Sequence, residues 1–207
     1  MTPREPIPTY ETLPLRIETA RLVLRPWELG DVDAIWSTVS DPTFPIHMTW
    51  AAHTDRAQTV AFVELHQRLL AEQKSIGWAI TRDGVVVGCI SLDGIRWTMN
   101  AARVDQANLG FWTARDHWRQ GYMTEAVEAV LGFAFGPLGL HKVYVAHVEG
   151  NEGSRRVIEK VGFRPVGRLE EEHYRDGRWW SGMRYELTAG EHLDSSRTMR
   201  INTRRQP

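Results

Sequence analysis

A short segment in the middle of the chain has the residue types of an anion-binding turn. Residues 112–126 read WTARDHWRQGYMTEA, with Arg119 and Gly121 between an apolar run and a helical pattern. Such a loop exposes several backbone N–H groups, and the start of a helix adds about half a positive charge. Gly121 would let the backbone approach a phosphate, and Arg119 could add a charge-assisted contact. A pyrophosphate site fits these residues, although a turn glycine followed by an N-cap at Thr124 would give the same pattern.

A second segment gathers polar side chains at another helix start. Residues 151–163 read NEGSRRVIEKVGF, so Asn151 or Ser154 can cap a helix whose apolar residues pack inward. In a functional interpretation, both side chains point from the helix start toward the ligand of the first segment. Neither GxxxxGK[ST] nor GxGxxG occurs in the chain, which disfavours a nucleotide-dependent transferase.

The bulk composition excludes several classes of protein. The 207 residues suffice for one domain, and 25 Lys and Arg against 26 Asp and Glu argue against a general nucleic-acid binder. The only cysteine, Cys89, rules out an internal disulfide, fits a reducing cytoplasm, and is expected to be a buried apolar residue. No apolar run approaches the roughly 20 residues of a membrane helix. The histidines lack metal-ligand spacing, so no metal is expected.

The elements that must position these segments follow from hydrophobic periodicity. Asp83-Gly84 between two β-branched runs is the signature of a hairpin. We expect strands at 21–25, 75–82, 85–92, 106–112, 141–148, 163–169 and 178–187, and helices from about 31, from about 55, at 125–135 and at 154–161. The chain divides into an irregular N-terminal arm (1–16), one mixed α/β domain (17–188) and a disordered tail (189–207).

Taken together, the two polar segments resemble the GNAT superfamily of N-acetyltransferases. The resemblance is carried by RQGYMTEA at 119–126, N-x-x-S at 151–154 and EKVGF at 159–163. The opening ETxRLxLRP at 18–26 brings the chain closest to the RimJ/RimL branch, the ribosomal-protein N-terminal acetyltransferases. The likeness extends over about residues 17–187, nearly the whole folded part.

This resemblance implies a fold and a co-substrate. The fold would be a single α/β domain with a mixed, mostly antiparallel sheet, flanked by helices and splayed open beside the strand that ends near Trp112. Acetyl-CoA would lie in the split, with its pantetheine arm on the β-strand backbone, its pyrophosphate on the amides from Arg119 to Thr124, and its thioester sulfur near Ser154. The implied cofactor-binding residues are Phe111, Trp112, Thr113, Arg119, Gln120, Gly121, Tyr122, Met123, Thr124, Asn151 and Ser154.

The chain departs from the family pattern at three positions. Met123 stands where the family usually has Gly or Ala. The proposed glutamate base of the ribosomal-protein enzymes corresponds here to His173, and the acidic residue often found after the last turn is Ser181. Ser154 and His173 are therefore the candidate catalytic residues, and three neighbouring carboxylates could replace His173 as the base: Glu170, Glu171 and Glu172.

The resemblance implies acetyl transfer from acetyl-CoA to a primary amine, on a protein N-terminus or a small molecule, by direct attack in a ternary complex. An oxyanion donor is expected among the backbone amides of 109–112. The alternative is a non-catalytic acyl-CoA-binding module of the same fold. Loop 44–50 is the candidate for acceptor recognition, and four tryptophans would flank that side: Trp50, Trp112, Trp179 and Trp180. The acceptor, and whether the protein is a monomer or a homodimer, stay open.

Overall fold

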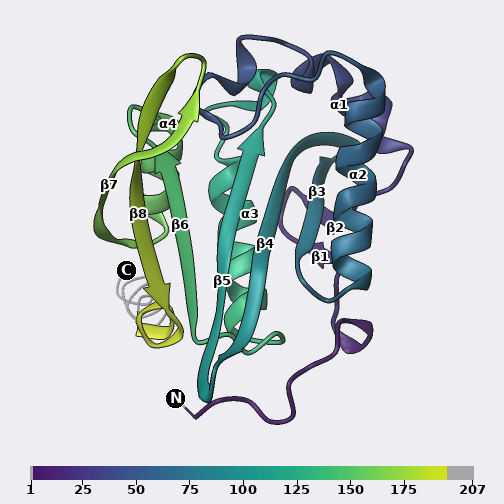
Figure 1. Cartoon of the computed structure of the whole chain (residues 1–207). Coiled ribbons are helices and arrows are strands. Elements are labelled where there is room, and N and C mark those ends of the chain that lie inside the picture. The colour runs from purple at the N-terminus through teal and green to yellow at the C-terminus, as the bar shows by residue number, and fades with distance from the viewer. Residues whose placement is uncertain (1, 195–207) are drawn as a thin grey trace, which may run out of the picture.

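One eight-stranded sheet organises the chain in the computed structural model, which describes residues 2–194 (Figure 1). The strand order is β1-β2-β3-β4-β5-β6-β8-β7, and every neighbouring pair is antiparallel except β5–β6. The strands are β1 (Ile17–Glu18), β2 (Val23–Pro26), β3 (Ile76–Arg82), β4 (Val85–Met99), β5 (Ala102–Thr113), β6 (Lys142–Val148), β7 (Arg164–Arg175) and β8 (Arg178–Thr188). The mixed, mostly antiparallel sheet that was expected is confirmed.

The parallel pair is short, and it opens a split in the sheet. β5 and β6 are paired only from Gln106↔Lys142 to Leu109↔Val145. Beyond Leu109 the last residues of β5 keep their ladder with β4 but have no strand on the β6 side. Figure 1 shows the two strands diverging toward the end at which β5 leads into α3. One edge of β5 is therefore left without a β6 partner.

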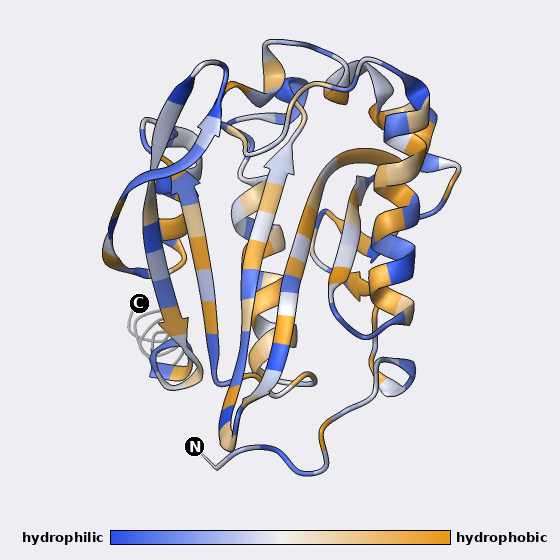
Figure 2. Ribbon diagram, viewed as in Figure 1, coloured by the Kyte–Doolittle hydropathy of each residue, from blue (hydrophilic) through white to orange (hydrophobic). Residues whose placement is uncertain are grey.

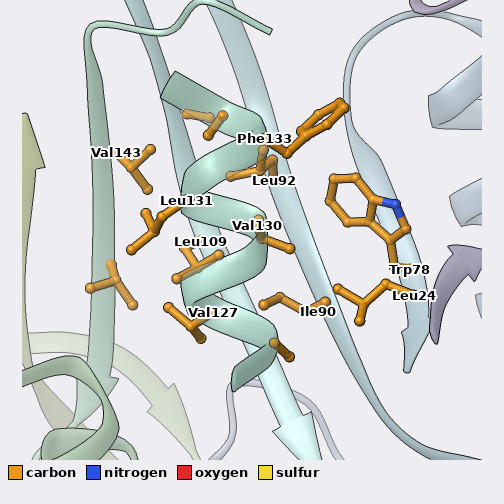
Figure 3. Packing of buried hydrophobic residues seen from close by; sticks show 14 of the residues in the cluster. Leu24, Trp78, Ile90, Leu92, Leu109, Val127, Val130, Leu131, Phe133 and Val143 are labelled. Atoms are coloured by element: carbon orange, nitrogen blue, oxygen red, sulfur yellow. The ribbon is translucent and has the colours of Figure 1, made fainter. Parts of the chain in front are cut away.

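Helices cover both faces of the sheet. α3 (Tyr122–Phe135) lies on one face and buries Ala126, Val130 and Phe133 against the strands. Figure 3 shows this contact, in which Phe133 meets Trp78 edge-to-face at 5.5 Å. α1 (Asp31–Val39) and α2 (Arg56–Ala71) supply the second apolar cluster, which packs on the opposite side chains of the central strands. α4 (Glu152–Lys160) follows β6.

The sheet is apolar at its centre and polar at one edge. In Figure 2 apolar residues concentrate on β4 to β6 and α3, whereas β7 is mostly hydrophilic. Most residues of β7 are exposed, and the strand is interrupted by a register shift between Leu169 and His173, with Glu171 at φ +48°. Because charged residues disfavour strand, the sequence placed the end of this strand at residue 169, six residues too early.

Two other boundaries differ from the expectation. The hairpin of β4 and β5 extends to Met99 and Ala102, although the sequence pattern supported strand only over 85–92 and 106–112. These added residues are largely exposed or half-buried, so they lack the apolar run that identified the rest. α3 begins at Tyr122, three residues earlier than predicted, directly after Gly121.

The two ends of the domain are more ordered than the sequence suggested. The N-terminal arm contains a 3-10 turn, η1 (Tyr10–Thr12), whose Tyr10 is buried, and the indole of Trp78 donates to the Leu15 carbonyl at 2.6 Å. Residues 189–194 are helical rather than part of a tail, and Ala189 is fully buried. The remainder of the predicted tail, 195–207, lies outside the described residues. No helix within 2–194 is long and apolar enough to cross a membrane.

Candidate active site

A cavity of about 530 Å³ lies at the open end of the split. Five segments line it: residues 44–48, the end of β5, residues 115–121, the start of α3, and residues 150–157. Ten of the eleven residues predicted to bind the cofactor contribute to its wall, all except Gln120. The side-chain amide of Gln120 instead donates to the Asp116 carbonyl at 3.0 Å. The structure thus brings the two polar segments of the sequence to one site.

The turn before α3 has free backbone donors. Gly121 is the N-cap residue, with φ +78°, and no side chain caps the helix start among the described residues. The first N–H groups of a helix have no intrahelical partner, so here they are available to a ligand. Arg119 also has positive φ (+60°) and lines the cavity. Uncapped amides beside a cationic side chain fit a pyrophosphate.

Residues 19–21, in the bend between β1 and β2, hold this turn through hydrogen bonds. The Arg21 guanidinium donates to the Gln120 carbonyl at 2.9 Å and to Glu125 at 2.7 Å, and it lies 4.7 Å from the centre of the Tyr122 ring. Thr19 donates to the same carboxylate at 2.6 Å. Burial raises the pKa of Glu125, but the hydrogen bonds from Thr19 and Arg21 outweigh it and lower that pKa overall. The opening motif of the chain therefore holds the turn in place.

Asn151 and Ser154 meet at the opposite wall. Asn151 caps α4, accepting from the Ser154 N–H at 3.1 Å, so the capping interpretation is confirmed for Asn151. Its amide also donates to the His47 carbonyl at 3.5 Å. Both side chains line the cavity. Capping and facing the cavity are thus compatible roles for the same residue.

Met123, the departure from the family pattern, lies in the first turn of α3. The residue is 8% exposed and belongs to the main apolar cluster, and it also contributes to the cavity wall. It therefore lies where the apolar cluster meets the cavity.

The predicted bases lie outside the cavity wall. His173 stands opposite Trp180 in the β7–β8 ladder. Glu170 is ion-paired with Arg168, and Glu172 with Arg184 at 3.0 Å. The N–H of Glu171 donates to the hydroxyl of Ser181 at 3.2 Å, which fixes the bulge of β7. Neither His173 nor any of the three glutamates contributes to the cavity.

Loop 44–50, the segment expected to recognise the acceptor, does reach the cavity. Phe44, Ile46, His47 and Met48 line it, and Phe44 contacts Trp112 edge-to-face at 5.8 Å. Of the four tryptophans expected on this side, Trp112 alone lines the cavity; the other three, Trp50, Trp179 and Trp180, do not.

Arg175 fastens this loop to the β7–β8 hairpin. Its guanidinium donates to the carbonyls of Ile46 (2.6 Å), Pro45 (2.7 Å), Trp50 (3.3 Å) and Met48, and its side chain is only 14% exposed. Sequence reasoning missed this contact, because its partners lie 125–130 residues away and are backbone atoms. No local pattern could have indicated it.

The single thiol does not contribute to the cavity wall. Cys89 is buried on β4 in the cluster beneath α1 and α2. Burial raises the pKa of this thiol well above its usual range. The expectation that Cys89 is a small buried apolar residue is confirmed.

Comparison with known proteins identifies relatives of the chain. Residues 21–164 match the acetyltransferase (GNAT) domain model. The uncharacterized N-acetyltransferase YoaA of Bacillus subtilis is 26% identical over 163 residues, which cover 78% of this chain and 89% of YoaA. An uncharacterized N-acetyltransferase, p20, of Bacillus licheniformis is 26% identical over 164 residues, 77% of this chain and 88% of p20.

Two solved structures with bound coenzyme A share the fold. RimL, a ribosomal L7/L12 alpha-N-protein acetyltransferase, superposes with a TM-score of 0.76 at 18% identity, covering 84% of this chain and 97% of RimL. Spermidine N-acetyltransferase from Vibrio cholerae, solved with CoA and spermine, superposes with a TM-score of 0.73 at 20% identity, covering 84% and 99%.

Proposed function

Because the chain belongs to the acetyltransferase (GNAT) family, whose reaction depends on acetyl-CoA, we propose that it acetylates a primary amine by direct attack in a ternary complex. The acceptor is a protein N-terminus or a small-molecule amine. The observation that carries the proposal is the single cavity in which the uncapped start of α3, the unpaired edge of β5 and the start of α4 meet. Two of the similar solved structures are named for their acceptors, the α-amino group of a ribosomal protein and spermidine, and both acceptor groups are amines.

Three groups of residues would hold acetyl-CoA. The pyrophosphate fits the N–H groups from Gly121 to Thr124 and the guanidinium of Arg119. The pantetheine amides fit the β5 backbone over 111–113, where no β6 partner occupies the edge. The indole of Trp118 already donates to the Thr113 carbonyl at 2.6 Å, so the remaining backbone groups of that edge are the ones available. Asn151 and Ser154 would contact the end that carries the acetyl group.

The reaction requires no covalent intermediate with the protein. A thioester is an activated acyl donor, so the enzyme must orient the amine, accept its proton and stabilise the charge that develops on the carbonyl oxygen. The C–N bond forms, the C–S bond breaks, and the thiolate takes up a proton. Ser154 lines the cavity with a hydroxyl that makes no hydrogen bond to the described residues, and it would donate one to the sulfur. Backbone amides of 109–112 would stabilise the oxyanion.

The proposed mechanism uses no metal ion. Within residues 2–194, no group of three or more His, Cys, Asp and Glu side chains is arranged to hold a metal ion. The steps proposed here use backbone donors, a hydroxyl and a base of the chain itself.

The first prediction tests binding and transfer separately. Calorimetry should show acetyl-CoA binding in the micromolar to sub-millimolar range usual for enzyme substrates. A panel of polyamines, amino acids and peptides with N-terminal Ala or Ser should then yield at least one acetylated product by mass spectrometry. Binding without transfer to any amine would favour the acyl-CoA-binding module, and ATP binding tighter than acetyl-CoA would favour a nucleotide-dependent transferase.

A further inference from the structure

The proposed transfer needs a base beside the acyl donor, and His173 and its neighbours lie outside the cavity. We propose that His47 is the catalytic residue that accepts the proton of the acceptor amine. The inference rests on the proposed function and names the group that performs one of its steps. It is carried by the position of the ring, by the accessibility of its two nitrogens, and by the pairing of the competing carboxylate.

The ring of His47 lies at the start of α4. A Cβ built on Gly150 would stand 3.7 Å from its Cε1 atom, and the Trp180 ring meets it edge-to-face at 6.1 Å and 89°. The His47 carbonyl accepts from Asn151. The imidazole is thus held between the β6–α4 loop and the β7–β8 hairpin, at the end of the cavity that also contains Ser154.

The two ring nitrogens of His47 differ in accessibility. Nδ1 is buried and has no hydrogen-bond partner within residues 2–194. Nε2 makes no hydrogen bond to the described residues either, but it is not among the buried atoms, and the side chain lines the cavity. Only Nε2 can therefore exchange a proton with a bound amine or with water. A fixed ring with one free nitrogen is the arrangement that general-base catalysis requires.

The competing titratable groups of the wall are less suited to this task. Glu152 is the one carboxylate among the described residues that line the cavity. The hydrogen bond from Arg155, at 2.7 Å, lowers the pKa of Glu152 and makes it a weaker base. His117 lies near Tyr122, on the side of the proposed phosphate site. Of the two histidines that line the cavity, only His47 contacts the start of α4, the helix that carries Ser154.

The charged groups around His47 are mostly cationic. On the hairpin side, Arg178 lies 3.5 Å from the centre of the Trp180 ring and Arg175 lies 5.7 Å from it. α4 contributes Arg156 together with the paired Glu152, and Arg115 binds the loop at Thr43. A pH dependence assigned to His47 must therefore be separated from the ionisation of the amine and of Glu152.

The step balances without another reactant. An acceptor ammonium first loses a proton to give the free amine. As its nitrogen bonds to the carbonyl carbon, the second proton passes to Nε2 of His47, the C–S bond breaks, and the thiolate is protonated. His47 then returns its proton to water, and each turnover of an ammonium releases one proton overall.

The test compares His47→Gln with wild type on the amine that wild type acetylates best. We expect kcat to fall at least about 10²-fold, with acetyl-CoA affinity by calorimetry unchanged. Because a general base must be deprotonated to accept a proton, wild-type kcat should fall toward acid pH and give the pH profile an acid limb. The kcat of His47→Gln should no longer fall in this way at acid pH. Added imidazole should restore part of the rate of His47→Ala. His141→Gln, an exposed histidine at the far end of β6, is the matched control and should behave as wild type.

Three results would overturn the assignment. The first is a pH profile of His47→Gln that equals that of wild type. The second is a lower kcat in His47→Gln that still falls at acid pH, together with no recovery of His47→Ala by added imidazole. The third is loss of the fall at acid pH in His173→Gln but not in His47→Gln. Failure of the proposed function has a different signature, because wild type itself would then bind no acetyl-CoA or acetylate no amine.

Discussion

At the scale of single residues, Gly121 is required by its backbone conformation. Its φ of +78° lies in the left-handed region, whereas a Cβ there would stand 3.4 Å from the Arg21 guanidinium, an ordinary contact with the end of a flexible side chain. An L-residue in that conformation costs about 1–2 kcal/mol, and relief of the strain would move the turn that carries the free amides. The spacing of Gly121 and the helix pattern predicted the turn before α3, because a turn and a helix start are local features of the sequence. The role of Gly121 in binding a pyrophosphate stays a prediction.

The second prediction follows from that geometry. Gly121→Val should lower acetyl-CoA affinity by tenfold or more, about 1.4 kcal/mol, as measured by calorimetry. The matched control is Gly162→Val, since Gly162 also has positive φ (+93°) and open space around it but lies after α4, away from the cavity wall. Both variants should lose thermal stability. Equal acetyl-CoA affinity in the two would contradict the pyrophosphate assignment.

The position of His47 at the cavity could not be predicted from local sequence. The sequence marked loop 44–50 for acceptor recognition, but it assigned the base to His173 by counting from the family motif. Which histidine faces the cavity depends on contacts with Gly150 and Trp180, more than 100 positions away. Such contacts leave no trace in local spacing.

At the scale of elements, the loop and the hairpin act as one unit. Four carbonyls between Pro45 and Trp50 converge on the guanidinium of Arg175, so a 3-10 turn, η2 (Phe44–His47), and the segment after it follow the position of β7. Hydrogen bonds to a charged group contribute about 1.5–3 kcal/mol each in favourable cases. The planar fork of arginine suits several carbonyls better than a single ammonium does.

The third prediction concerns the hydrogen bonds from Arg175 to loop 44–50. Arg175→Met should raise KM for the amine about tenfold and lower kcat, because the loop that lines the acceptor side and carries His47 is no longer fixed, while acetyl-CoA affinity stays unchanged. Arg175→Lys should recover little. Arg184→Met is the control, since Arg184 on β8 is ion-paired with Glu172 on β7, is 48% exposed and does not contact loop 44–50. An unchanged KM in Arg175→Met, determined by steady-state kinetics, would show that the loop holds its place without these hydrogen bonds.

Element prediction succeeded where pattern and turn chemistry agreed. The β3–β4 hairpin around Asp83-Gly84 is confirmed, with the register Arg82↔Val85. It failed where strands continue through exposed residues, as in β4 beyond residue 92 and β7 beyond residue 169. Cross-strand pairing stabilises those extensions, and pairing partners are not visible in a single segment.

At the scale of the whole molecule, the fold brings the start of the domain to the turn before α3, in the middle of the chain. Residues 19–21 and Glu125 are more than 100 positions apart, yet Thr19 and Arg21 give that carboxylate three hydrogen bonds. The family resemblance, rather than periodicity, predicted a mixed sheet that is split beside β5, but the order of the strands is known only from the structure. Local patterns predict strands but not their neighbours.

The fourth prediction is a pH dependence of stability. The folded state lowers the pKa of Glu125 below its ordinary 4.5, so this group contributes stability above about pH 4.5 that is lost as the pH falls through the folded pKa. Glu125→Gln should therefore lower the free energy of unfolding by about 1–2 kcal/mol at pH 7. Below pH 4.5 the two proteins should converge. Urea denaturation at pH 7 and pH 3.5 measures both values; a constant difference would assign the effect to packing.

The burial of Cys89 has a practical consequence. The chain contains one sulfhydryl, and in the native protein it is covered by the apolar cluster and is poorly ionised. A chromogenic disulfide reagent added during turnover would therefore find no reactive sulfur on the catalyst. Every equivalent of colour could be attributed to released coenzyme, which would make continuous screening of acceptors possible without blank subtraction for the enzyme.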